Sequence, residues 1–157
     1  MPGQFSGPRD QRTLEARADL PCYTSAPLER DLDVIGPVRL VLFVRSSLAH
    51  TDFLGRLCDV YPDGRSINIC DGLLRLAPGS GARQPTAACG SRSAVEYGVP
   101  LPARPSPAPV LASGAHPRWS RNLGLGQPLA SAVLMRVAEQ AVFHDPAHPS
   151  ALLLPVI

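Results

Sequence analysis

Histidine and aspartate side chains near the end of the chain are the residues whose types could hold a metal ion. His116, His144 and His148 supply imidazoles, and Asp145 supplies a carboxylate. A helical zinc site places two histidines four residues apart on one helix face. His144 and His148 have this spacing, but Pro146 lies between them in a turn sequence that breaks a helix. The pattern favours a tight corner, and we predict neither a metal ion nor another cofactor.

A serine, a histidine and an aspartate in the first third of the chain could form a hydrolytic triad. Ser25, His50 and Asp52 have the types that activate a serine nucleophile. In an α/β-hydrolase the nucleophile lies in a G-x-S-x-G turn between a strand and a helix, and this chain contains no such motif. We therefore predict that the chain holds no catalytic residue.

Three further features carry weaker signals. Asp59 and Asp71 lie inside apolar runs. A buried carboxylate needs donors or a cation, so backbone or arginine partners are expected rather than catalysis. Trp119 lies between two arginines and fits either the edge of a core, which we favour, or a shelf on which a ligand stacks. The glycines of Gly124-x-Gly126 indicate a loop.

Composition and cysteine spacing exclude several classes of protein. The net charge is +2, and all 15 basic residues are arginine, so neither nucleic acid nor a membrane surface is a predicted partner. No secretory signal opens the chain, and its longest apolar run, Val38–Val44, is too short to span a bilayer, so a cytoplasmic location is expected. Cys22, Cys58, Cys70 and Cys89 lack C-x-x-C spacing, which leaves reduced cysteines as the simplest expectation.

A β-hairpin over residues 50–76 is the strongest structural signal. Two apolar runs, Phe53–Tyr61 and Ser66–Leu76, flank the turn sequence Pro62-Asp63-Gly64-Arg65. The apolar parity changes along the second run, which predicts a β-bulge at Asp71-Gly72. The run Val38–Arg45 is apolar on both faces, as in a strand at the centre of a packed sheet. Further short strands are expected at Leu20–Leu28, Leu32–Ile35, Gln140–His144 and Ala151–Ile157. The strand Leu32–Ile35 is expected to end at Gly36-Pro37.

Other segments give less definite patterns. Residues 1–18 are polar and are interpreted as a linker or tail. From Ala77 to Pro109 the chain is rich in Pro, Gly, Ala, Ser and Arg, and no period of 2 or 3.6 residues survives. Residues 131–137 favour a strand, with an amphipathic helix over residues 130–140 as the alternative. Residues 145–149 favour a tight corner.

Six short motifs occur in the order in which one domain family carries them. They are Gly7-Pro8-Arg9-Asp10-Gln11-Arg12, Tyr23-Thr24-Ser25-Ala26-Pro27-Leu28, Thr51-Asp52-Phe53, Asp59-Val60-Tyr61-Pro62-Asp63-Gly64-Arg65, Pro117-Arg118-Trp119-Ser120-Arg121-Asn122 and His144-Asp145-Pro146-Ala147-His148-Pro149-Ser150. In these motifs the chain resembles the C-terminal β-sandwich of the CocE/NonD hydrolases, relatives of the X-Pro dipeptidyl-peptidases and of bacterial cocaine esterase. The resemblance covers residues 7–76 and 112–157.

The resemblance implies an all-β, galactose-binding-like jelly roll over residues 19–157 that is interrupted at residues 77–111. In the family this domain holds no triad residue, and it packs on an α/β-hydrolase domain that carries the Ser-Asp-His triad. The implied function is non-catalytic shaping of the active site of a serine esterase or dipeptidyl-peptidase, and the implied partner is the hydrolase domain that this chain lacks. The alternatives are a stand-alone jelly-roll module that binds a ligand, for which one Trp and three Tyr are few, and an independent small esterase.

The resemblance fails between Ala77 and Leu111, where the family has two core strands around a Phe-Leu-Pro-Gly-His turn. One set of GC-rich codons for Val95–Val110, translated one base later, gives Ser-Ser-Thr-Ala-Tyr-Arg-Phe-Leu-Pro-Gly-His-Arg-Leu-Arg-Leu, which is similar to the missing segment. We therefore favour a shifted reading frame over a genuine Pro-rich insertion. Loss of two core strands would remove about 7–15 kcal/mol of apolar burial, as much as a whole domain's stability. The sequence thus predicts an incomplete sandwich with a disordered middle segment.

Overall fold

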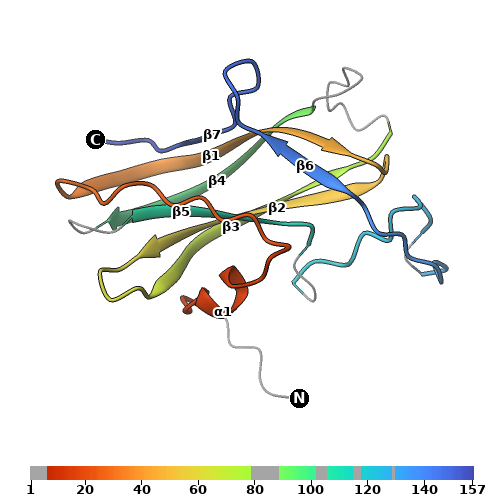
Figure 1. The fold of residues 1–157 in the computed structure, drawn as a ribbon, viewed down its shortest axis with the longest axis horizontal. Coiled ribbons are helices and arrows are strands. Elements are labelled where there is room, and N and C mark those ends of the chain that lie inside the picture. The colour runs from red at the N-terminus through yellow and green to blue at the C-terminus, as the bar shows by residue number, and fades with distance from the viewer. Residues whose placement is uncertain (1–6, 79–88, 102–105, 115–117, 129) are drawn as a thin grey trace.

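The computed structural model describes residues 7–78, 89–101, 106–114, 118–128 and 130–157. The chain forms two antiparallel sheets that face each other (Figure 1). The predicted all-β sandwich is confirmed. The first sheet contains β4 (Cys89–Leu101), β1 (Leu32–Ser46), β6 (Gln140–Phe143) and β7 (Ala151–Leu153), and the second contains β3 (Ser66–Leu76), β2 (Thr51–Val60) and β5 (Ser106–Ala112). The single helix of the described residues, α1 (Arg12–Glu15), is short.

Strand β1 is the centre of the first sheet, as its two apolar faces predict. It pairs with β4 along one edge and with β6 and β7 along the other. The predicted break at Gly36-Pro37 is wrong, because the ladder with β4 continues through both residues. Gly36 adopts a φ of 124°, which bends the strand without ending it.

The predicted hairpin is confirmed, but its bulge lies elsewhere. Leu57 is opposite Cys70 while Cys58 is opposite Asn68, so the extra residue on β3 is Ile69. Asp71 stays in register with Arg56, to which its carboxylate is bound. This cross-strand ion pair accounts for the bulge lying two residues before the expected place.

Strands β4 and β5 correct the prediction that residues 77–111 lack regular structure. β4 pairs with β1 over thirteen registered positions, from Leu32↔Leu101 to Val44↔Cys89, and β5 pairs with β2 over seven. Neither strand has the apolar alternation that identifies a strand from sequence. Backbone pairing with two strongly predicted strands defines them instead. Residues 79–88 and 102–105 of this segment lie outside the described residues.

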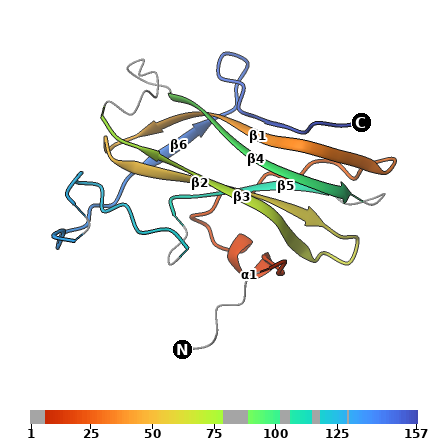
Figure 2. The ribbon, with the colours of Figure 1, turned by 180° about the vertical axis from the view of Figure 1, so that it is seen from behind.

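Residues 7–18, the described part of the predicted tail over residues 1–18, contact the second sheet, while the domain bounds stay a prediction. Gln11 is buried, its N–H donates to the carbonyl of Ser66 at 2.7 Å, and its side-chain oxygen accepts from Arg56 at 2.6 Å. The carboxylate of Glu15 in α1 accepts a hydrogen bond from the Ser66 hydroxyl. Both figures of the whole chain show α1 beside the outer face of the second sheet (Figure 2).

The core lies between the two sheets. Buried side chains of β1 meet buried side chains of β2, β3 and β5 in two clusters, Val34, Val38, Leu57 and Cys70 in one and Leu42, Val44, Phe53 and Leu111 in the other. At Gly55 the sheets approach so closely that a Cβ atom would collide with Leu40. A third cluster of Cys58, Ala108 and Val110 covers the outer face of the second sheet.

Residues 131–137 form neither the predicted strand nor the alternative helix. Val133 and Val137 are 90% and 86% exposed, so the apolar residues that favoured a strand pack on no sheet. By contrast, the strand predicted at Gln140–His144 is confirmed as β6, which ends at Phe143. Of the strand predicted at Ala151–Ile157, Ala151–Leu153 forms β7, and Val156 makes an isolated bridge to Val34. The corner over residues 145–149 is also confirmed, because Asp145 accepts hydrogen bonds from the N–H groups of Ala147 and His148.

Candidate functional site

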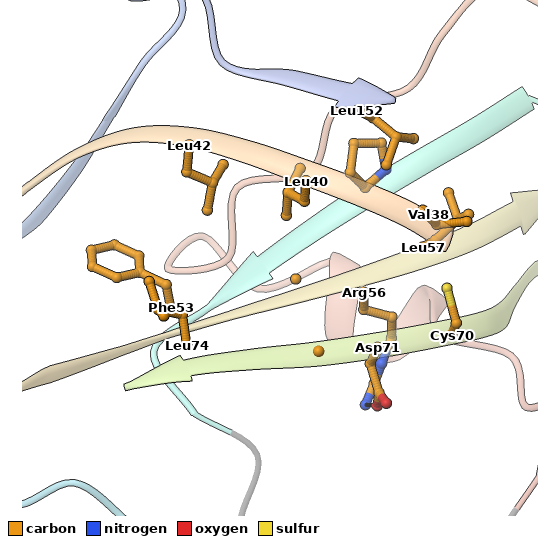
Figure 3. Close-up of a pocket in the computed structure, with 13 residues that line it drawn as sticks. Val38, Leu40, Leu42, Phe53, Arg56, Leu57, Cys70, Asp71, Leu74 and Leu152 are labelled. Atoms are coloured by element: carbon orange, nitrogen blue, oxygen red, sulfur yellow. Dashed lines mark hydrogen bonds and ion pairs between the residues drawn. The ribbon is translucent and has the colours of Figure 1, made fainter. Parts of the chain in front are cut away.

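A small cavity lies between the sheets where two glycines face each other. Gly55 and Gly72 are opposite neighbours on β2 and β3, and the missing side chains leave about 50 Å³ of space. Figure 3 shows apolar side chains of β1 directed toward it, while Arg56 and Asp71 point to the opposite side of their sheet. An apolar cavity of this size stays dry and has no polar group to orient a substrate.

A larger apolar groove of about 400 Å³ lies along the open edge of the sandwich. Tyr23, Pro107 and Pro109 form its wall on the side of the second sheet, and His144 and Leu152 form the opposite wall. The rings of Tyr23 and His144 meet edge to face at 5.7 Å. The groove therefore offers an apolar surface with few polar groups, which suits packing rather than bond chemistry.

The buried carboxylate of Asp52 is the centre of the densest polar network. Arg75, directly opposite on β3, donates to both of its oxygens at 2.9 and 2.7 Å. The amide of Asn122 donates to the same carboxylate at 2.7 Å, and the Arg75 guanidinium also reaches the carbonyl of Ser120. The Gln140 side chain donates to the backbone carbonyl of Asp52 at 3.0 Å. The network thus fastens the loop after residue 118 and the start of β6 to the second sheet.

Asp71 has the arginine partners that the sequence predicts. Arg56 lies 3.1 Å from one carboxylate oxygen, and Arg118 lies 2.7 Å from the other. The guanidinium of Arg118 also lies over the ring of Trp119 at 4.6 Å. These contacts join the loop after residue 118 to the outer face of the second sheet, which is a structural role.

Asp59 differs from this prediction. It is buried, and among the residues that the structure describes its Oδ1 atom has no hydrogen-bond partner and no arginine forms an ion pair with it. Burial raises the pKa of Asp59, while a hydrogen bond from Tyr61 acts in the opposite direction. Asp59 thus has Tyr61 as its side-chain partner where an arginine or the backbone was expected.

The serine, histidine and aspartate considered as a triad are not brought together. The N–H of Ser25 donates to the carbonyl of Pro107, which is opposite Asp59 near the end of β2. Asp52 lies at the start of β2, seven residues earlier, which corresponds to about 23 Å along a strand. Its carboxylate is occupied by the network with Arg75, so it does not orient a histidine.

The candidate metal ligands also take structural roles. The ring of His148 contacts the carboxylate of Asp145 at 3.1 Å within the corner and packs against Phe43 and Phe143. His144 faces Tyr23, and His116 lies outside the described residues. Within the described part of the chain, no three His, Cys, Asp or Glu side chains form a group that could hold a metal ion.

The cysteines with described side chains are free thiols. Cys58 and Cys70 lie on paired strands, but Cys58 belongs to the outer cluster and Cys70 to the core between the sheets. Burial raises the pKa of Cys58 to about 12 and that of Cys70 to about 11. Both thiols are therefore unreactive core groups.

The motifs singled out in the sequence meet one another in space. Asp52 of one motif binds Asn122 of another. Tyr23 and His144, from two further motifs, also contact each other. The first motif lies beside β3, where Asn68 donates its N–H to the carbonyl of Arg9. Sequence analysis grouped these motifs by their order alone and missed Arg75 and Gln140, which complete the network around Asp52. The signal for Arg75 was its place opposite Asp52 in the hairpin register.

The fold is a β-sandwich, and its conspicuous polar side chains join segments of the domain to one another. The family model described as the X-Pro dipeptidyl-peptidase C-terminal non-catalytic domain matches residues 4–109. The chain belongs to this family. Among the described helices, none is long and apolar enough to cross a bilayer.

Relatives of the chain are ester hydrolases of greater length. Cocaine esterase of Rhodococcus sp. is 35% identical over 168 residues, which include 97% of this chain but 28% of the esterase. A putative serine esterase of Mycobacterium bovis is 45% identical over 66 residues, 42% of this chain and 10% of that protein. The chain thus spans less than a third of the length of these relatives.

Solved structures show the same fold. An aminopeptidase from a Thaumarchaeota archaeon of marine sediment has a TM-score of 0.76 at 22% identity, over 94% of this chain and 27% of that one. An α-amino acid ester hydrolase has a TM-score of 0.73 at 22% identity, with the same shares of the two chains covered. In both, the similar region is about a quarter of the solved chain.

Proposed function

We propose that this chain is the supporting sandwich of a serine hydrolase acting on esters or on X-Pro peptides, and that it packs on an α/β-hydrolase portion and shapes its active site. The observation that carries the proposal is the coverage of cocaine esterase, because 97% of this chain corresponds to 28% of that enzyme. The family description, a non-catalytic C-terminal domain, supports the same role. Bond cleavage then belongs to the remaining portion of such a hydrolase.

The polar networks support a packing role. Asp52 and Asp71 bind arginine and asparagine side chains instead of being presented to a substrate. Their contacts stabilise the loops at one end of the sandwich, which is what a domain needs in order to offer a fixed surface to a neighbour.

The test combines this chain with the catalytic portion of Rhodococcus cocaine esterase, meaning the residues of that enzyme outside the region that this chain matches. Hydrolysis of 4-nitrophenyl acetate and its persistence at 37 °C are measured for each component and for the mixture. We expect no turnover by this chain alone, and a longer active half-life of the catalytic portion in the mixture. Turnover by the 157-residue chain that a single serine substitution abolishes would contradict the proposal.

The groove of about 400 Å³ is the observation that favours the alternative, a stand-alone ligand-binding module. Sugar-binding surfaces use exposed aromatic rings, whereas Tyr23 is the one aromatic side chain besides His144 in this lining. A packing role accounts better for a groove lined by leucine and proline. A cytoplasmic location stays part of the proposal and is supported by the free thiols of Cys58 and Cys70.

A further inference from the structure

An apolar loop over residues 130–138 extends from one end of the sandwich. Val133 and Val137 are 90% and 86% exposed, and Leu134 and Met135 are 64% and 63% exposed. Figures 1 and 2 show the loop, in blue, beyond the ends of the strands. Four large apolar side chains are thus exposed within five residues, and exposed apolar residues that gather in this way mark an interaction surface.

The base of this apolar loop is fastened on both sides. Before it, the amide of Asn122 donates to the buried carboxylate of Asp52 at 2.7 Å. After it, Glu139 and Ser47 exchange two hydrogen bonds of 2.9 Å, from the Ser47 N–H to the Glu139 carbonyl and from the Glu139 N–H to the Ser47 hydroxyl. Within it, the N–H of Arg136 donates to the carbonyl of Leu123 at 3.0 Å. The backbone of the loop is therefore anchored before any partner binds, which lowers the entropy lost on binding.

The charges that flank the apolar loop are mainly positive, and Glu139 directly after the loop is the exception. Residues 118–138 include three arginines and no aspartate or glutamate. Arg118 is bound to Asp71, whereas for Arg121 and Arg136 the described residues provide no carboxylate within 4 Å. An apolar centre with arginines at its rim has the composition of a protein interface. The complementary surface must be apolar with acidic groups around it.

We propose that the apolar loop is the surface by which this chain docks on the catalytic portion of the hydrolase, an inference that rests on the proposed function. The occupant has to come from outside this chain, and the relatives carry about three-quarters of their length outside the matched region. A second copy of this chain is the other possible occupant, and the sedimentation measurement below tests it. On the catalytic portion, we expect the groups opposite Arg121 and Arg136 to be acidic.

The test uses the full 157-residue chain and the catalytic portion of Rhodococcus cocaine esterase defined above. Amide hydrogen exchange is measured on this chain alone and in the mixture, and affinity is measured by titration. We expect residues 130–138 to exchange about tenfold more slowly in the mixture, while the exposed turn at Asp63-Gly64 is unchanged. Val133→Asp combined with Val137→Asp should weaken binding at least about tenfold. Ile157→Asp, at an apolar side chain that is 80% exposed elsewhere, is the matched control and should change affinity by less than about twofold.

The outcomes separate this inference from the proposed function. Binding that the double aspartate variant leaves intact, with protection at another surface, overturns docking through the apolar loop and leaves the proposed function standing. No binding of the wild-type chain contradicts the proposed function and this inference with it. Sedimentation of this chain alone gives a third check. A dimer that dissociates in the double aspartate variant would assign the loop to self-association and overturn the inference.

Discussion

Two prolines in β5 reduce its hydrogen bonding to the neighbouring segment. The carbonyls of Pro109 and Pro107 accept from the N–H groups of Tyr23 and Ser25 at 3.1 and 3.3 Å. In an antiparallel ladder such a pair normally exchanges two hydrogen bonds, but a proline has no N–H to return. The same two prolines line the groove between the sheets. Replacement of both by leucine, Pro107→Leu with Pro109→Leu, is therefore expected to stabilise the domain.

The size of the effect follows from three contributions at each position. A restored hydrogen bond contributes about 1 kcal/mol, and the one additional buried carbon of leucine contributes about 0.8 kcal/mol. Removal of a proline frees the unfolded chain, which costs about 0.7 kcal/mol. The sum is about 1 kcal/mol at each position and about 2 kcal/mol for the double variant. For a chain of this length that raises the melting temperature by about 4–8 °C.

Thermal and urea unfolding followed by circular dichroism measure this difference. Pro128→Leu is the matched control, because Pro128 is exposed in a loop, and we expect its free energy of unfolding to stay within about 0.5 kcal/mol of wild type. A double leucine variant that melts at or below the wild-type temperature would refute the reasoning. It would show that the segment Pro21–Ser25 does not pair with β5 as the hydrogen bonds indicate.

Substitutions at three other positions test individual contacts. Asp59→Asn should raise the melting temperature at pH 7 and lose this advantage toward pH 4. The folded state raises the pKa of Asp59, so wild type loses stability as the pH rises through the folded pKa, and melting curves across pH check it. Asp52→Ala should lower the free energy of unfolding, measured in urea, by about 2–3 kcal/mol. This loss is smaller than is usual for a fully buried ion pair, because the Arg75 side chain is partly exposed to water. Gly55→Ala should change the melting temperature little, since the Leu40 side chain can turn into the adjoining cavity, whereas Gly55→Val should lower stability by about 2 kcal/mol.

Elements with strong local signals were predictable from the sequence. The hairpin of β2 and β3 follows from a turn sequence between two apolar runs, and the central place of β1 follows from its two apolar faces. Where one long-range contact determines the structure, the local sequence pattern predicts it wrongly. The ion pair between Arg56 and Asp71 holds their register and moves the bulge to Ile69. The break expected at Gly36 disappears because its ladder with β4 supplies the pairing.

Partners of individual polar residues were predictable only in part. Buried carboxylates in apolar strands require cations, and this argument gives the arginine partners of Asp71. It fails for Asp59, because it states what a carboxylate needs without showing that a cation is within reach. Asn122 approaches Asp52 from a loop 70 residues away in the sequence, and a local sequence pattern cannot predict a contact between such distant residues.

The bounds of β4 and β5 bear on the reading frame of the middle segment, which stays a prediction. β4 ends at Leu101 and β5 begins at Ser106. The shifted translation places its Phe-Leu-Pro-Gly-His turn at positions 101–105, from the last residue of β4 to the residue before β5. It places leucine at positions 107 and 109. These are the two positions that border the groove and lack a backbone donor in the present sequence. The shifted frame would also place arginine at position 108, where Ala108 is 2% exposed. A buried arginine there would require a carboxylate partner, such as Glu15 near Cys58. The coding DNA decides between the frames, because bases that forbid the shifted peptide leave the prolines as native residues. The stabilisation of the double leucine variant would then measure only the loss of stability that Pro107 and Pro109 cause in β5.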